Sequence, residues 1–228
     1  MIVMKFGGTS VGNALRIREV VGIVKSQLGN GPIVVVSALG GITDALIETG
    51  KQAAAGKDVN VMLDQIVKRH YDTIAELKLE QKIIAPEVEQ LGKLVGDIFM
   101  LGELGPRNLD RLMSFGERMS ARIVAACMRS AGLDGEAYDA YDIGMITTSN
   151  FGDADITPYT YQRIRKALAG KSCIPVITGF LGKSKEGEIT TLGRGGSDYT
   201  ASIVGAAVGA KEIQIWTDYF MFILLSFV

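Results

Sequence analysis

The sequence lacks the features that mark several specialised classes of protein. Its 24 Lys and Arg residues are balanced by 25 Asp and Glu residues, so no basic surplus favours nucleic acid and no charged block suggests a tail. No stretch reaches the roughly 18 apolar residues of a membrane-spanning helix. The N-terminal apolar run is too short for a signal peptide. Any anion must therefore be bound by local geometry, and neither nucleic acid nor a membrane is an expected partner.

Cysteine and histidine are equally scarce. Cys127 and Cys173 lie far apart in apolar surroundings, and we expect them to be reduced core residues of a cytoplasmic protein. A zinc site is unsupported, because the chain has one histidine and no paired cysteine motif. That histidine, His70, lies within VKRHYD on a predicted helix, and we expect it at the surface.

The rest of the composition is rich in apolar residues and glycine. With 228 residues, 47% of them hydrophobic, the chain can bury a sizeable core. Apolar runs at 2–6, 33–36, 173–180 and 212–216 predict buried strands, and helical patterns separate them. Strands that are apolar on both faces and alternate with helices are typical of a parallel sheet covered on both sides. We therefore predict an α/β fold with a three-layer, doubly wound, mostly parallel sheet.

A long helical region interrupts this alternation. Strand signals vanish from residue 44 to about residue 130, and helical periodicity is clear at 61–78 and 86–104. These patterns predict a helical insertion at about 44–113. The main body resumes with the segment SFGERMSARIVAACMRSAG.

Polar residues predict where the first two helices begin. Thr9 or Ser10 is expected to cap a helix that runs to about Leu28. Thr43 or Asp44 is expected to cap the next helix.

Four short segments share one design, in which a strand end is followed by small residues and a helix start. Ligands of open α/β sheets bind outside the carboxyl ends of the strands. Glycines there let backbone N–H groups approach a phosphate, although glycines can equally serve only to make tight turns. The segments are KFGGTS (5–10), SALGGIT (37–43), SFGE (114–117, with Ser114 near a helix start and Glu117 in its first turn) and GRGGSD (193–198).

The sequence does not match the standard phosphate-binding motifs. A P-loop needs glycine five residues before GK[ST], but the two GKS sequences have Arg165 and Ile177 at that position. The dinucleotide fingerprint G-x-G-x-x-G begins at Gly193, but Asp198 stands where its last glycine should be. Neither a Walker ATPase nor a nicotinamide enzyme is indicated.

Two cations stand beside these glycines. Lys5 is a charge in an otherwise apolar strand, so it either faces a ligand phosphate at the strand end or extends to solvent from an edge strand. Arg194 is suited to a carboxylate or phosphate, or is a solvated loop residue. Asp198 and Asp218 are candidate caps or turn residues, and equally candidates to position a lysine or a magnesium ion.

Taken together, these segments resemble the aspartokinases of the amino acid kinase superfamily. KFGGTS, VVVSALGGIT, SFGERMSA, ITGFLGKSKEGEITTLGRGGSDYTAS and IQIWTD occur in the family's order and extend to residue 218. The resemblance implies ATP- and Mg²⁺-dependent transfer of a phosphoryl group to the β-carboxylate of L-aspartate, the first step toward lysine, threonine and methionine. It also implies an amino acid kinase domain over 1–218, made of an aspartate-binding lobe and the start of a nucleotide lobe.

The resemblance also implies roles for individual residues. Lys5 would neutralise the transferring phosphoryl group, and Asp198 would organise that lysine. Arg194 would hold the α-carboxylate of aspartate and Glu117 its ammonium group. The other matching positions are Thr43 and Ser197 for aspartate, and Gly7, Gly8, Thr9, Ser37, Thr217 and Asp218 for ATP; no residue is implied as a metal ligand.

The resemblance stops after residue 218. The family's VDG turn and the ACT regulatory domains do not follow, and the apolar tail YFMFILLSFV at 219–228 reads like out-of-frame translation. We therefore expect weak or absent kinase activity from this chain alone. A kinase for another amino acid and a non-catalytic aspartate-binding protein stay open as alternatives, and a homo-oligomer is expected.

Overall fold

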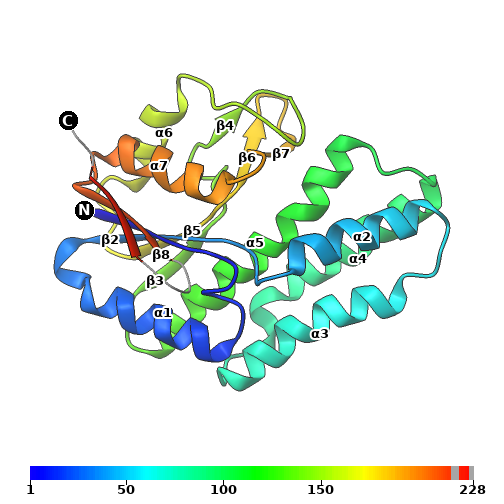
Figure 1. Ribbon diagram of the computed structural model, residues 1–228, viewed down its shortest axis with the longest axis horizontal. Coiled ribbons are helices and arrows are strands. Elements are labelled where there is room, and N and C mark those ends of the chain that lie inside the picture. The colour runs from blue at the N-terminus through cyan, green and yellow to red at the C-terminus, as the bar shows by residue number, and fades with distance from the viewer. Residues whose placement is uncertain (217–220, 226–228) are drawn as a thin grey trace.

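The computed structural model describes residues 1–216 and 221–225, which form an α/β protein with two sheets (Figure 1). The larger sheet has the order β3-β5-β2-β1-β8-β9, and every pair is parallel except β8 with β9. Its strands are β1 Ile2–Phe6, β2 Pro32–Val36, β3 Gly135–Tyr138, β5 Ile174–Thr178, β8 Glu212–Trp216 and β9 Met221–Leu225.

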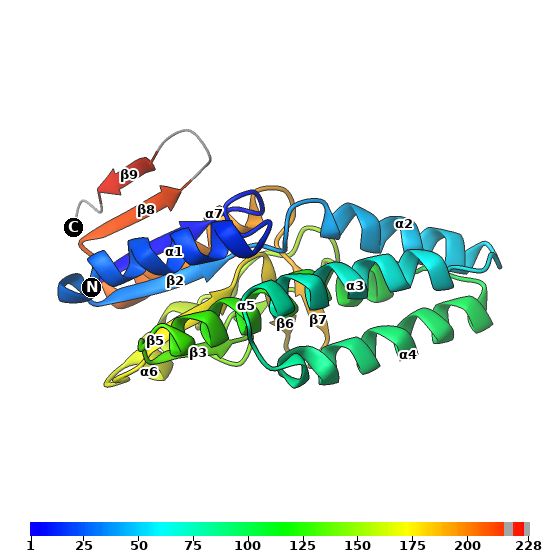
Figure 2. The same ribbon diagram turned by 90° about the horizontal axis from the view of Figure 1, so that it is seen from below.

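Both faces of the central strands β1, β2 and β5 are buried, which explains why these strands are largely apolar without alternation. In β1, Ile2, Met4 and Phe6 belong to one core cluster, whereas Val3 belongs to the other. Helices α1 (Ala14–Ser26) and α5 (Pro106–Ser130) supply the first cluster, and α6 (Thr160–Leu168) and α7 (Gly196–Val208) supply the second. Figure 1 shows the sheet between these layers, and Figure 2 shows α1 in front of the sheet. The predicted three-layer, mostly parallel fold is confirmed.

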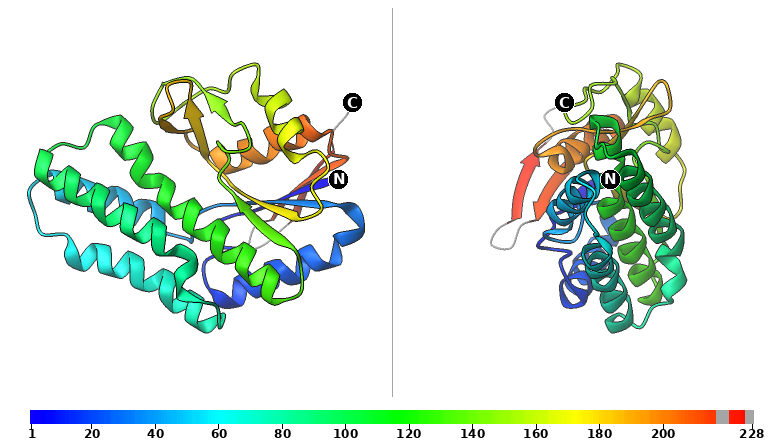
Figure 3. Two further views of the ribbon diagram at one scale, coloured as in Figure 1. Left: turned by 180° about the vertical axis from the view of Figure 1, so that it is seen from behind. Right: turned by 90° about the vertical axis from the view of Figure 1, so that its right-hand side faces the viewer.

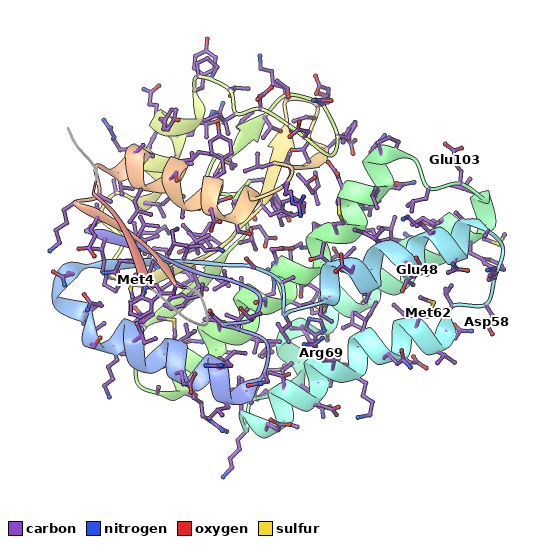
Figure 4. The ribbon with its side chains drawn as sticks, viewed as in Figure 1. Met4, Glu48, Asp58, Met62, Arg69 and Glu103 are labelled. Carbon is purple, nitrogen blue, oxygen red and sulfur yellow. The ribbon has the colours of Figure 1, made fainter. Side chains whose placement is uncertain are left out.

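A bundle of helices extends from one end of the sheet. It consists of α2 (Ile42–Ala54), α3 (Asn60–Glu76), α4 (Ala85–Leu101) and the first turns of α5, and a short 3₁₀ segment at Gln81–Ile84 leads into α4. Another 3₁₀ segment, Leu28–Asn30, follows α1. Figure 3 shows that α5 runs from the tip of this bundle back under the sheet. Arg69 of α3 donates a hydrogen bond to the Gly12 carbonyl at 3.3 Å, which joins the bundle to the loop after β1 (Figure 4). The exact limits of the insertion stay a prediction.

A small second sheet lies above the C-terminal ends of the main strands. It contains β4 (Ile146–Thr147), β6 (Leu181–Ser184) and β7 (Ile189–Thr191), and β6 and β7 form an antiparallel hairpin. No helix in the described ranges 1–216 and 221–225 is long and apolar enough to cross a membrane.

The expected caps of the first two helices were wrong. Asn13 caps α1, because its side chain accepts a hydrogen bond from the Arg16 N–H at 3.0 Å, so Thr9 and Ser10 stay in the preceding loop. Gly41 precedes α2 in a left-handed conformation (φ 80°), and no side chain caps that helix. Gly41 adopts this φ readily because it has no Cβ.

The expected helix start at Ser114 was also wrong. Helix α5 begins at Pro106, a residue favoured in the first turn, so Ser114 and Glu117 lie well inside the helix and SFGE is not a loop. Position 116 in this helix requires glycine, because a Cβ there would lie 2.7 Å from the Ala38 Cβ. The glycine therefore serves close packing of a helix against a loop.

The predicted burial was wrong for His70 and wrong in part for the cysteines. His70 is fully buried, on the face of α3 that also buries Ile66 and Thr73, and its Nδ1 lies 2.8 Å from the Ile66 carbonyl oxygen. Cys127 is buried as expected, whereas Cys173 is only half-buried. Both cysteines are free thiols.

Candidate active site

A pocket of about 370 Å³ opens at the carboxyl ends of the central strands. Segments far apart in the sequence meet there, as expected for the crevice of an open parallel sheet. The lining residues are Lys5, Gly8, Ser37, Ala38, Leu39, Gly40, Gly41, Thr43, Asp44, Glu117, Phe180, Gly193, Arg194, Gly195, Gly196, Ser197 and Asp198.

Lys5 supplies a cation from the middle of the sheet. Its strand β1 lies between β2 and β8, which excludes the alternative of a lysine on an edge strand. Lys5 shares the face of Val3, toward α7, and its Nζ lies 2.7 Å from Oδ1 of Asp198 in the first turn of that helix. The lysine side chain is 11% exposed and that of Asp198 is 53% exposed, so the pair lies at the boundary between core and pocket.

The two glycine loops that follow β1 and β2 touch each other through their backbones. The Gly40 N–H donates to the Gly8 carbonyl at 2.9 Å, and a Cβ on Gly8 would lie 3.0 Å from the Ala38 carbonyl oxygen. Larger side chains at either glycine would force these loops apart. The glycines therefore bring backbone groups of both loops to one side of the pocket.

Helices α2 and α7 both begin at the pocket. Their N-caps, Gly41 and Gly195, are left-handed glycines, and neither helix has a side chain that accepts a hydrogen bond from its first N–H groups. The N-terminus of a helix carries unsatisfied N–H groups and a partial positive charge. With Lys5 and Arg194, these two termini make the pocket suited to anions.

Glu117 is the buried acid of the pocket. It is 3% exposed, its Oε1 accepts a hydrogen bond from the Ala38 N–H at 3.1 Å, and its Oε2 finds no hydrogen-bond partner among the described residues. Burial raises the pKa of Glu117 to about 7, against the opposing effect of the Ala38 N–H. An unpaired buried carboxylate oxygen is costly unless a ligand supplies a donor.

Arg194 and Ser197 reach the pocket from the loop and first turn that lead into α7. Arg194 is exposed and makes no ion pair among the described residues, so its guanidinium is available to an anion. Ser197 lies against Gly179, where a Cβ would come within 2.5 Å of the Ser197 Oγ. That close approach fixes the start of α7 against the end of β5.

Most of the predicted site residues meet in this pocket, but some do not. Gly7 lies beside it, where a Cβ would be 3.4 Å from Lys5 Nζ, and Thr9 is exposed outside the lining. Thr217 and Asp218 lie outside the described residues, as do the ends of the apolar tail. Within that tail, Met221–Leu225 forms strand β9 beside β8.

Phe180 is a pocket residue that the sequence patterns did not single out. It has a left-handed backbone (φ 68°), which is rare for a bulky side chain. Its N–H donates to the Thr200 Oγ1 at 3.0 Å, and its carbonyl accepts from the Leu192 N–H at 2.9 Å. Such strain is held by surrounding contacts and has no local sequence signal.

Comparison with known proteins agrees with the fold. Residues 1–219 match the model of the amino acid kinase family, and the chain belongs to that family. Aspartokinase 1, chloroplastic, of Arabidopsis thaliana is 41% identical over 225 residues, which cover 95% of this chain and 40% of that protein. An aspartokinase of Thermus thermophilus is 34% identical, over 96% of this chain and 42% of that protein.

The same relationship is seen among solved structures. The crystal structure of E. coli aspartokinase III in complex with aspartate and ADP superimposes with a TM-score of 0.83 at 28% identity, covering 96% of this chain and 49% of that one. Clostridium acetobutylicum aspartate kinase superimposes with a TM-score of 0.78. The chain thus spans about 40% of the length of these curated relatives and about half that of these solved structures.

Proposed function

We propose that this chain carries the aspartate-binding half of an aspartate kinase site, and that the enzyme transfers the γ-phosphoryl group of ATP to the β-carboxylate of L-aspartate. The observation that carries the proposal is the juxtaposition of the buried, half-paired Glu117 with Lys5 and Arg194 in one pocket. The aspartokinase relatives, one of them solved with aspartate and ADP, support the same substrate.

The charges of the pocket suit the groups of aspartate. The ammonium group would donate to the Oε2 of Glu117, which would satisfy a buried carboxylate oxygen. The planar fork of Arg194 would hold the α-carboxylate, and Thr43 and Ser197 would add hydroxyl contacts. The β-carboxylate would then point toward the phosphate side of the pocket, where Lys5 and the N-terminus of α7 lie.

The reaction needs positioning and charge neutralisation more than acid–base catalysis. A β-carboxylate oxygen attacks the γ-phosphorus of ATP, a new O–P bond forms, and the bond to the bridging oxygen breaks to give ADP and 4-phosphoaspartate. The carboxylate is already ionised at pH 7, so no proton must be removed from it. Lys5 would neutralise the charge on the transferring group while Asp198 holds its Nζ in place.

The residues present fit a Mg²⁺ ion that arrives with the nucleotide. No group of three or more acidic, histidine or cysteine side chains that could hold a metal occurs in the described part of the chain. Mg²⁺ is commonly bound by substrate phosphates with only one or two carboxylates. When bound, the ion would supply further neutralisation of phosphate charge, beside the exposed carboxylate of Asp198.

Binding and turnover test the proposal separately. Isothermal titration of this chain with L-aspartate should give saturable binding that Arg194→Ala weakens measurably, whereas L-glutamate and acetylglutamate should bind more weakly than L-aspartate. A coupled assay for ADP release with Mg-ATP then measures turnover. Absence of L-aspartate binding, or binding equal to that of L-glutamate, would sink the assignment, and binding without turnover would favour the non-catalytic alternative.

Further expectations stay predictions. The reaction would be the first step toward lysine, threonine and methionine. A cytoplasmic location, a homo-oligomeric state and the contributions of Thr217 and Asp218 to a nucleotide site have the resemblance to aspartokinases as their support.

A further inference from the structure

A second buried carboxylate lies on the same helix as Glu117, outside the pocket lining. Asp110 is 0% exposed, and it makes no ion pair among the residues described by the structure. Its Oδ2 accepts hydrogen bonds from the Thr191 N–H at 2.8 Å and the Gly152 N–H at 3.0 Å. Its Oδ1 accepts from the Thr191 hydroxyl at 2.9 Å. One buried carboxylate thus receives three donors from two separate loops.

The two segments that donate to Asp110, the end of β7 and the loop at 150–154, both lie beside the loop that carries Arg194. Thr191 ends β7 three residues before Arg194, and its carbonyl accepts from the Ala154 N–H at 2.9 Å. Between them, Gly193 is left-handed (φ 71°), and a Cβ there would lie 2.3 Å from the Asp153 Oδ1. The loop at 150–154 therefore presses against the backbone that carries the arginine, and Asp110 ties both segments to α5.

Helical spacing places Asp110 and Glu117 on the same side of α5. They are seven residues apart, which is close to two turns, and so about 10 Å along the helix axis. Glu117 reaches the pocket directly, and Asp110 holds the loop that brings Arg194 to it. One rigid helix therefore sets the distance between the groups proposed to hold the ammonium and the α-carboxylate.

We propose that Asp110 is a positioning residue for substrate binding, which holds the Arg194 loop at the distance from Glu117 that the α-carboxylate and ammonium groups of an amino acid require. The inference rests on the proposed function for the identity of the ligand. The fixing of the two loops by Asp110 rests on the hydrogen bonds alone.

The substitution Asp110→Asn tests this with little change of shape. The neutral amide replaces the charged acceptor of all three hydrogen bonds, so the hold on both segments weakens. Hydrogen exchange should then accelerate in 150–154 and 189–196 and stay unchanged in β1 and β2. L-Aspartate should bind about tenfold more weakly, as expected for loss of a hydrogen bond to a charged group. Asp97→Asn, at an exposed position of α4, is the matched control.

A double-mutant cycle separates positioning from general loss of stability. If Asp110 acts through Arg194, Asp110→Asn should cost little further affinity in the Arg194→Ala background. It should also leave β-alanine binding unchanged, because β-alanine lacks the α-carboxylate. Equal losses in both backgrounds, or exchange at 189–196 like that of the wild type, would overturn the inference.

A second pair of variants covers the case in which Asp110→Asn does not fold. Thr191→Val removes the hydroxyl that donates to Asp110 Oδ1, and Thr191→Ser keeps it. The valine variant should show the faster exchange at 189–196 and the serine variant should not; identical behaviour of the two would count against the inference. If the wild-type chain binds no L-aspartate, the proposed function fails, while the exchange measurement still decides the role of Asp110.

Discussion

Lys5 Nζ and Asp198 Oδ1 lie 2.7 Å apart, although 193 positions of sequence separate these residues. The contact forms because Lys5 points from β1 toward the first turn of α7, where Asp198 lies next to the glycine cap of the helix. A lysine in a buried strand is costly without a partner, and the partner sits at the pocket edge. The pair therefore holds a cation at the edge of the pocket.

Replacing Lys5 should separate stability from ligand binding. Lys5→Met keeps the length of the side chain and removes a largely buried charge, so the free energy of unfolding should stay within about 1 kcal/mol of the wild type. Binding of inorganic tripolyphosphate should be lost. Urea denaturation and titration calorimetry measure the two effects, with Lys25→Met on the exposed side of α1 as control. Retained tripolyphosphate binding would contradict the role of Lys5.

The affinity for L-aspartate should increase with pH. Burial raises the pKa of Glu117 to about 7, and an ammonium group binds its ionised form. About one tenth of the carboxyl groups are ionised at pH 6, so affinity at pH 6 should be roughly tenfold below that at pH 8. Binding should release protons, which titrations in buffers of different ionisation enthalpy detect. Glu117→Gln should abolish the dependence and Glu103→Gln, at the tip of the bundle, should not (Figure 4).

Two buried titrating groups, His70 and Glu117, should affect stability in opposite directions. Desolvation lowers the pKa of His70 from 6.5 to about 4, so its contribution is present above pH 6.5 and is lost as the pH falls toward 4. The raised pKa of Glu117 has the reverse effect, since stability is lost as the pH rises from 4.5 through 7. Each shift corresponds to about 3 kcal/mol, so the two effects largely cancel between pH 4.5 and 6.5.

Single substitutions should reveal these opposing slopes. His70→Phe should give a protein whose free energy of unfolding falls with increasing pH between 4.5 and 6.5, because the effect of Glu117 is then no longer offset by that of His70. Glu117→Gln should give a protein whose stability rises over the same range. Urea denaturation at intervals of half a pH unit measures both slopes, and parallel slopes in the two variants would refute the explanation.

Two glycines in neighbouring helices should respond oppositely to alanine. A Cβ on Gly116 would lie 2.7 Å from the Ala38 Cβ, so Gly116→Ala should displace the loop after β2 and lower both stability and L-aspartate affinity. A Cβ on Gly96 of α4 would meet nothing within 4 Å, so Gly96→Ala should raise stability by up to about 1 kcal/mol. Thermal unfolding and calorimetry compare them. A stabilised Gly116→Ala would contradict the packing argument.

Local patterns were sufficient for the four strands β1, β2, β5 and β8 and for most pocket residues. Strand β1 was predicted because four of its five residues are apolar. The remaining residue, Lys5, was a candidate site residue because a charge in a buried strand needs a partner. Loops rich in glycine were predicted as ligand loops because backbone approach needs glycine. The prediction of a loop at SFGE was wrong, because its glycine lets helix α5 pack closely against Ala38. No local pattern contains that contact.

The sequence by itself determined the class of fold and the chemical types of group available to the site, because hydrophobic runs, glycines and isolated charges act through local backbone and burial preferences. Only the tertiary structure decided which groups meet. It buried His70, left one oxygen of Glu117 unpaired in the pocket, and tied the Arg194 loop to Asp110. These relationships depend on the distances between elements far apart in the chain, which are set by how the helices pack on the sheet.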